Sequence, residues 1–160
     1  MRVSITVGET EFKNGYINID PISGSDSGDA EGAIKADVRN LDDIIINSEC
    51  IEIVAEDVLD YLVRVEAIST LRHWVTKLRK GGKIIIGGTD AFEVSKQFCQ
   101  KIIGVDDFNA IIHGEFSQPW DTKLSHMSLE DLQQQLESYG IKIIKRRVNG
   151  FKFVVEGERP

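Results

Sequence analysis

The stretch from Cys50 to Gly88 constrains the fold more than any other part of this 160-residue chain. Two short apolar runs, Cys50–Ala55 and Lys83–Gly87, are rich in Ile and Val, which is typical of buried parallel strands. Between them, from about Asp57 to Leu78, apolar residues recur every three or four positions and predict one long helix. The stretch therefore predicts a strand–helix–strand unit with a right-handed crossover.

The remaining segments extend this unit into a sheet. Alternating and β-branched residues predict three further strands, at Arg2–Val7, Tyr16–Asp20 and Ala33–Val38. Asn149-Gly150 lies between two more apolar runs, 141–147 and 151–156, and is a strong hairpin signal. We therefore expect a single α/β domain over residues 1–160. Its expected architecture is a three-layer, doubly wound, mostly parallel sheet of seven strands that ends in a C-terminal antiparallel hairpin.

Capping residues predict two more helices. One should run from Asp90 to Ile103 with Thr89 or Asp90 as its N-cap, and another should begin at Ser128 and end at Gly140. Three other segments are expected to be less regular. The composition of Pro21–Gly32 is that of a loop, Val105–Thr122 is expected to be irregular, and Leu41–Ile46 is either a helical turn or an extended piece.

Charge and composition narrow the classes of function. The net charge of −7 argues against a general binder of nucleic acid or of anionic membranes, because both require a basic face. Apolar runs of about 20 residues, the length that spans a bilayer, are absent, and Met1 opens no signal-peptide pattern. Cys50 and Cys99 stand far apart and predict no metal site. A cytoplasmic protein is expected.

Acidic residues close several of the predicted strands. Asp20, Asp37 and Glu56 lie where ligands of open α/β sheets bind, beyond the carboxyl ends of the strands. Carboxylates there can accept hydrogen bonds from ribose hydroxyls or an adenine amino group, although each acid could also simply end its strand or cap a helix. The glycine-rich loops of dinucleotide and P-loop nucleotide sites are absent, which removes the main support for those functions.

An ordered set of motifs carries a family resemblance. The chain resembles small S-adenosylmethionine-dependent methyltransferases of the Rossmann-like class I, and the resemblance covers nearly its whole length. The motifs are Gly15–Asp20 (Gly-Tyr-Ile-Asn-Ile-Asp), Ala36–Val38, Val58–Leu62, Glu66-Ala67, Trp74 with Leu78–Gly82, Ile112–Gly114, His126 and Ser128–Leu132. The resemblance implies the seven-stranded methyltransferase sheet and S-adenosylmethionine as cofactor.

The resemblance also assigns cofactor-binding positions. It implies that Gly8 is the first glycine of the cofactor turn, that Asp20 holds the ribose, that Asp37 and Val38 flank the adenine, and that Ala55 and Glu56 lie beside the cofactor. The implied function is methyl transfer to a small molecule or a sugar-type acceptor.

Methyl transfer requires alignment of nucleophile, methyl group and leaving sulfur, and often a base. Candidate catalytic residues are His113, His126 and Tyr61, with a structural role as the alternative for each histidine. Trp120 and Phe116 could form the wall of a pocket, or could instead pack beneath a loop.

One departure from the family pattern keeps a second function open. Thr10 replaces the second glycine of the cofactor turn, and Glu9 adds a negative charge beside it. The alternative is therefore a methyltransferase-like domain without activity that serves as a binding or scaffold partner. A receiver-like signalling domain is disfavoured, because the first strand ends in Gly8 rather than in an acidic cluster. We expect a small-molecule substrate, no nucleic-acid or membrane partner, and a monomer or homodimer.

Overall fold

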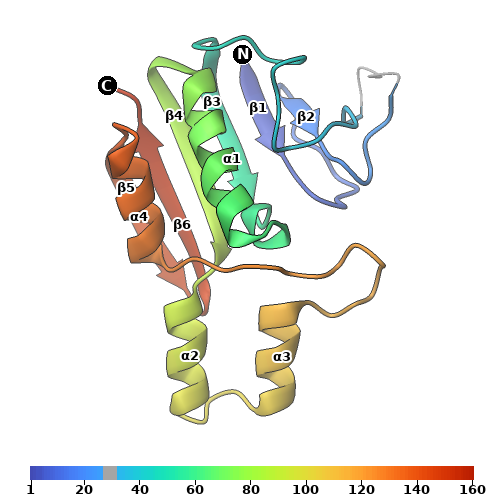
Figure 1. Ribbon diagram of the computed structural model, residues 1–160, viewed down its shortest axis with the longest axis vertical. Coiled ribbons are helices and arrows are strands. Elements are labelled where there is room, and N and C mark those ends of the chain that lie inside the picture. Colours follow the sequence, from blue (N-terminus) through green and yellow to red (C-terminus); the bar gives the residue numbers. More distant parts are fainter. Residues whose placement is uncertain (27–31) are drawn as a thin grey trace.

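A six-stranded sheet forms the centre of the protein (Figure 1). A computed structural model describes residues 1–26 and 32–160, so the predicted loop at 21–32 lies partly outside the described residues. The strand order is β2-β1-β3-β4-β6-β5; β1 to β4 pair in parallel, whereas β6 runs antiparallel to β4 and β5. The strands are β1 (Arg2–Ile5), β2 (Ile17–Ile19), β3 (Cys50–Glu56), β4 (Leu78–Thr89), β5 (Lys142–Asn149) and β6 (Lys152–Glu158). The predicted C-terminal hairpin is confirmed.

The expected third strand at Ala33–Val38 is wrong. Within the described residues Ile34 forms only isolated bridges, to Ile19 and Ser25, and the sheet therefore has six strands rather than seven. Ile34 exchanges backbone hydrogen bonds with Asn18 and Asp20 at the end of β2, and four residues later the carbonyl of Val38 instead accepts a hydrogen bond from the indole of Trp74.

The central strand–helix–strand unit is confirmed, but its helix is divided. A short 3-10 turn, η1 (Leu59–Tyr61), precedes the helix α1 (Arg64–Lys77), and Leu62 and Val63 between them are extended. The hydroxyl of Ser125 donates to the carbonyl of Leu62 at 2.6 Å. This tertiary contact takes up a carbonyl that a continuous helix would use internally, and so favours the break.

Three further helices follow β4. They are α2 (Ala91–Cys99), α3 (Val105–His113) and α4 (Leu129–Ser138). The predicted caps of α2 and α4 are confirmed, because Asp90 accepts from the N–H of Phe92 and Ser128 accepts from the N–H of Asp131. The expectation that 105–122 is irregular is wrong for its first half, which forms α3. No helix among the described residues is long and apolar enough to cross a membrane.

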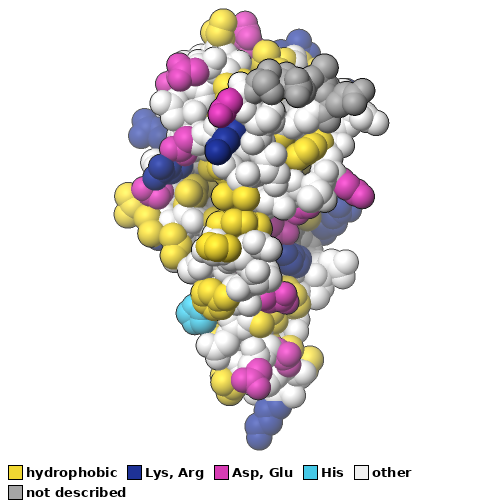
Figure 2. Space-filling view, turned by 90° about the vertical axis from the view of Figure 1, so that its right-hand side faces the viewer, with side chains coloured by type: hydrophobic (Ala, Val, Ile, Leu, Met, Phe, Trp, Pro, Cys, Tyr) yellow, Lys and Arg dark blue, Asp and Glu magenta, His cyan; other side chains and the backbone are white. Residues whose placement is uncertain are grey.

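The helices are distributed unevenly around the sheet. Both α1 and α4 lie on one face, whereas α2 and α3 form an arm beyond the carboxyl ends of β1, β3 and β4 (Figure 1). The opposite face carries polar residues such as Lys83 and Glu156, which form an ion pair at 3.0 Å. The three-layer arrangement is therefore not seen in the described part of the chain. From the side of β1 and β2, the molecule narrows toward the arm, and hydrophobic side chains gather in the middle of the face (Figure 2).

The core lies between the sheet and α1. Aligned residues of neighbouring strands, such as Val3, Ile53 and Ile84, are buried side by side because strands in register present alternate residues to the same face. Trp74 on α1 is fully buried against this layer. Burial of large apolar side chains contributes roughly 1.5–3 kcal/mol each, so this row of contacts fixes α1 on the sheet.

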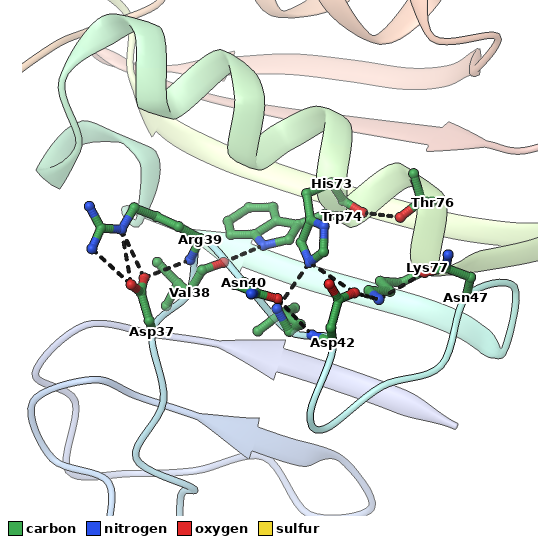
Figure 3. Close-up of polar contacts among 11 residues, drawn as sticks. Asp37, Val38, Arg39, Asn40, Asp42, Asn47, His73, Trp74, Thr76 and Lys77 are labelled. Carbon is green, nitrogen blue, oxygen red and sulfur yellow. Dashed lines mark hydrogen bonds and ion pairs between the residues drawn. The ribbon is translucent and has the colours of Figure 1, made fainter.

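Polar contacts fasten residues 37–47 to α1 (Figure 3). The indole N–H of Trp74 donates to the carbonyl of Val38 at 2.9 Å, and the N–H of Leu41 donates to Nε2 of His73 at 2.9 Å. One turn further on, the buried ammonium of Lys77 bonds Asp42 and, at 2.8 Å, the side-chain oxygen of Asn47. This segment is therefore held firmly enough to serve as the wall of a site.

We predict that Trp74→Phe lowers the free energy of unfolding by about 1–3 kcal/mol, the usual cost of leaving a buried hydrogen-bonding group unpaired. Most of the ring packing is kept, but the carbonyl of Val38 loses its donor. Urea denaturation measures the change. Trp120→Phe is the matched control, because the indole N–H of Trp120 makes no hydrogen bond to the described residues. Equal effects of the two substitutions would contradict the assignment.

We predict that stability falls in acid partly through His73. Burial lowers the pKa of its imidazole below the ordinary 6.5, and the nearby Lys77 acts in the same direction. Because the folded-state pKa is depressed, the contribution of the neutral ring is complete above about pH 6.5 and is lost as the pH falls through the folded-state value. In His73→Gln, whose amide oxygen can still accept from Leu41, urea denaturation should show a smaller stability loss between about pH 7.5 and about pH 5. An unchanged loss would assign it to other groups.

Candidate functional site

A cavity of about 510 Å³ opens at the carboxyl ends of β1 and β3. The chain passes from β1 to β2 on one side and returns to β3 on the other side of β1, so the strand order reverses here. Such switch points are the usual ligand sites of open α/β sheets. The lining residues are Val7, Pro21, Ile22, Asp26, Lys35, Ala36, Asp37, Val38, Arg39, Val58, Tyr61, Leu62 and Trp120.

One wall of the cavity combines apolar residues with a fixed carboxylate. Arg39 binds Asp37 through its guanidinium, with Nη2 at 2.8 Å from Oδ2, and reaches Glu66 at 3.0 Å (Figure 3 shows Asp37 and Arg39). The hydrogen bond from Arg39 lowers the pKa of Asp37, which is therefore ionised at neutral pH. The Asp37 carboxylate already accepts from three donors of Arg39, namely its backbone N–H, Nε and Nη2, so of about four lone-pair sites roughly one is left for a ligand on the half-exposed side of the group.

Asp20, the predicted ribose ligand, is fully buried at the end of β2. Its carboxylate accepts five hydrogen bonds from the chain itself. The donors are the Thr6 hydroxyl at 2.8 Å and the backbone N–H groups of Gly8, Glu9, Ile22 and Ser23 at 3.0, 3.0, 2.8 and 2.9 Å. A carboxylate offers about four lone-pair sites, so the chain's own donors saturate this one.

The turn after β1 lies directly beneath an aromatic ring. Gly8 has φ +73°, and a methyl group placed on it would lie 2.2 Å from Cζ2 of Trp120. The indole also meets the ring of Tyr61 edge-on, with centroids 5.7 Å apart. The space over Gly8 is therefore filled by Trp120, whereas the cavity beside it is open. Of the two roles that the sequence left open for Trp120, the structure shows the wall of a pocket.

Several solved structures with a similar architecture are methyltransferases. Over 90% of this chain, a SAM-dependent methyltransferase from Thermotoga maritima superposes with a TM-score of 0.60 at 14% identity, and the chain spans 73% of it. A Burkholderia thailandensis 1,6-didemethyltoxoflavin-N1-methyltransferase, solved with S-adenosylhomocysteine, gives 0.59 at 9% identity over 90% of this chain. An O-methyltransferase family protein from the same organism gives 0.54 at 14% identity over 79% of this chain.

The chain has the fold of the class I methyltransferases.

The relation is structural. No protein-family model matches the sequence, and no curated protein matches it. This chain spans 35% and 60% of the lengths of the two Burkholderia thailandensis proteins, so it corresponds to only part of each.

Within this methyltransferase fold, Tyr61 separates the cavity from a second one of about 260 Å³. Burial, with added repulsion from Asp121 and Asp57, raises the pKa of the Tyr61 phenol to about 12. The phenol therefore keeps its proton at neutral pH, and it lies 3.5 Å from Oδ1 of Asp121. Such a group suits a hydrogen-bond donor better than a general base. Lys123 and Lys152 also line the second cavity.

His126 lies beside the buried carboxylate of Asp60. Its Nε2 is 2.5 Å from the carbonyl of Ile112, and because a carbonyl only accepts, Nε2 carries a hydrogen. Nδ1 lies 3.7 Å from Asp60 Oδ2, and within the described residues it has no hydrogen-bond partner. Burial raises the pKa of Asp60, and attraction to His126 opposes that shift. The backbone carbonyl of Asp60 also accepts from the N–H of Leu124 at 2.8 Å, so this region fastens the α3–α4 connection to η1.

Some predicted site residues lie elsewhere. His113 faces a separate hollow with Asn109 and Phe116, Ala55 is buried in the core, and Glu56 lines a different cavity beside Gly87. Of the predicted site residues, Asp37, Val38 and Tyr61 line the open cavity, whereas Gly8 and Asp20 do not line it but directly follow and precede the lining residues Val7 and Pro21. The roles assigned to all of these residues in binding or catalysis stay predictions.

Sequence reasoning assigned no binding role to most residues that line the cavity, among them Ile22, Arg39 and Leu62. Arg39 lies two residues after Asp37, and this spacing allows an ion pair between them. For Arg39, that spacing was the sequence signal that could have indicated its place at the site. Ile22 and Leu62 look like ordinary core residues in the sequence, and only the folded chain places them at the cavity.

We predict that Gly8→Ala destabilises the protein more than Gly15→Ala. Both glycines have positive φ, at which an alanine costs about 1–2 kcal/mol, but the space around Gly15 is empty for 4 Å. The overlap with Trp120 should add about 1–3 kcal/mol at Gly8. Chemical denaturation of both variants, repeated in a Trp120→Ala background, forms a double-mutant cycle. The excess at Gly8 should vanish in that background, and its persistence would refute the contact.

Proposed function

We propose that the chain is an S-adenosylmethionine-dependent methyltransferase domain that binds the nucleoside half of the cofactor in the 510 Å³ cavity. The observation that carries the proposal is the position of this cavity, at the switch point of a methyltransferase fold. The cofactor would supply an electrophilic methyl group on a sulfonium. The proposed acceptor is a small molecule or a sugar-type compound.

The nucleoside half of such a cofactor fits the residues present. The cavity has the volume of a small-molecule site, for which roughly 300–1,000 Å³ is usual. Val7, Val38 and Leu62 offer apolar surface for a purine, and the ionised carboxylate of Asp37 offers an acceptor for a hydroxyl or amino group. The saturated Asp20 offers none, so Asp37 is the proposed partner of the sugar or the base.

The amino-acid half fits less well. Trp120 fills the space over Gly8, and the N–H groups of Gly8 and Glu9, which could otherwise bind a carboxylate, already donate to Asp20. We therefore assign the chain's residues to binding and orientation only. The second cavity, beyond Tyr61, is the proposed acceptor site, where Tyr61 and Asp121 would hold a hydroxylated small molecule by hydrogen bonds.

The second candidate function is a nucleoside-binding or scaffold domain without transferase activity. The observation that favours it is the combination of a saturated Asp20 and a Gly8 covered by Trp120. The two candidates differ in one measurable respect, because only the enzyme must bind the complete cofactor. A cytoplasmic location, a monomer or homodimer, and the lack of nucleic-acid and membrane partners stay predictions.

We predict that adenosine and S-adenosylhomocysteine bind in the cavity, and that Ile22→Trp weakens both by about tenfold or more, which corresponds to about 1.4 kcal/mol. Ile22 lines the cavity and is partly exposed, so a larger ring there would occupy the ligand volume. Isothermal titration calorimetry measures both affinities. Ile46→Trp is the matched control, since Ile46 is exposed and does not line the cavity.

Absence of heat with either ligand at millimolar concentration would sink the methyltransferase proposal and the nucleoside-binding alternative together. Binding that Ile46→Trp weakens as much as Ile22→Trp would place the ligand elsewhere.

A further inference from the structure

We infer that Trp120 is a specificity-determining residue of this cavity: it admits a nucleoside and excludes an attached amino-acid chain until its indole moves away from Gly8. The inference rests on the proposed function, because it concerns the same ligand site. It assigns to one side chain the preference between two ligands that share an adenosine group.

The first support is steric. A methyl group on Gly8 would already overlap Trp120 at 2.2 Å, so the ring and the turn are in direct contact and leave no room for a ligand chain between them. The same ring forms one wall of the open cavity. A ligand confined to the cavity therefore leaves Trp120 in place, whereas one that extends over Gly8 must displace it.

The second support is electrostatic. The amide groups of Gly8 and Glu9 point to the Asp20 carboxylate at 3.0 Å, and Asp20 is fully buried. A ligand carboxylate brought over this turn would find those donors engaged and would meet the charge of Asp20 beneath them. Glu9 adds a second negative charge on the exposed side. The ring of Trp120 and the charge near Gly8 and Glu9 therefore both act against the amino-acid chain of the ligand.

The third support is the attachment of the segment that carries Trp120. The connection between α3 and α4 reaches out beneath β1 and β2 (Figure 1). Its far end is anchored by the N–H groups of Lys123 and Leu124, which donate to His113 at 3.0 Å and to Asp60 at 2.8 Å. Between these anchors and α3, the described hydrogen bonds of residues 117–122 are local, such as Ser117 to Asp121 at 3.2 Å, except that the Tyr61 hydroxyl donates to Oδ1 of Asp121 at 3.5 Å.

Among the described residues, movement of this segment therefore breaks no hydrogen bond to a strand, and the bond that it loses outside the segment is the long one between Tyr61 and Asp121 at 3.5 Å. The segment also contains Phe116 at φ +54°, a left-handed conformation that costs a residue other than glycine about 1–2 kcal/mol. Relief of that strain would offset part of the cost of moving the indole. Trp120 is thus held over Gly8 chiefly by its ring contacts with the turn and with Tyr61.

The test compares adenosine with S-adenosylhomocysteine by isothermal titration calorimetry on the full chain, Trp120→Ala and Phe116→Ala. Phe116 is the matched control, an exposed aromatic residue of the same segment that does not line the cavity. Trp120→Ala should raise the affinity for S-adenosylhomocysteine relative to adenosine by about tenfold. Phe116→Ala should leave that ratio within about twofold of the original, because its ring touches neither ligand.

A second measurement needs no substitution. The chain has two tryptophans, and Trp74 is fully buried in the core. S-adenosylhomocysteine should therefore shift the emission of the unmodified protein to the red and increase acrylamide quenching, as Trp120 leaves Gly8. Adenosine should change neither. This readout remains available if Trp120→Ala folds poorly by circular dichroism.

The outcomes separate the two proposals. If adenosine and S-adenosylhomocysteine bind but Trp120→Ala leaves their ratio unchanged or lowers it, Trp120 is only a wall, and the inference is wrong while the proposed function stands. If neither ligand binds any variant, the proposed function fails and this inference fails with it.

Discussion

The buried carboxylate of Asp20 is the interaction on which the ligand-binding end of the fold depends. It connects the turn after β1 with the end of β2 and the residues that follow, through five donors from the chain. A carboxyl group so deeply buried is tolerated because the chain's donors satisfy its oxygens, and removal of those donors would leave buried polar atoms unpaired. Sequence reasoning assigned Asp20 to the ribose, but its carboxylate instead binds the turn at Gly8 and Glu9. These hydrogen bonds fix the backbone beside the cavity.

Much of the fold could be predicted because its signals are local. The Ile- and Val-rich strands β3 and β4, the Asn149-Gly150 hairpin and the caps at Asp90 and Ser128 depend on neighbours in the sequence. The errors have tertiary causes. The end of the segment 33–38 bonds Trp74 through the carbonyl of Val38 rather than a neighbouring strand, and the helix expected from Asp57 is interrupted where Ser125 binds Leu62. The helix α3 was overlooked although Asp106 and Asp107 in its first turn are typical of a helix start.

The site was less predictable than the fold. Strand ends identified the right edge of the sheet, and Asp37 with Val38 does line the cavity. Sequence position, however, does not reveal how a carboxylate is engaged: Asp20 and Asp37 look alike in the sequence, yet one is saturated and buried and the other is half exposed. The placement of Trp120 over Gly8 joins residues more than a hundred positions apart, and no local pattern encodes such a contact.

The cavity at the strand ends is open, but Trp120 covers the neighbouring turn at Gly8. This arrangement affects a ligand that extends over the turn and leaves a shorter one unaffected. If the conformation with Trp120 over Gly8 dominates, the apparent affinity for an extended ligand falls by the fraction of molecules in which the ring has moved away. A nucleoside, which needs no such movement, escapes that reduction. An acceptor or partner that holds the α3–α4 connection away from the turn would remove the reduction, and would thereby raise cofactor affinity without touching the cofactor. Under the proposed function, the position of one indole would therefore decide whether the chain binds only a nucleoside or the complete cofactor.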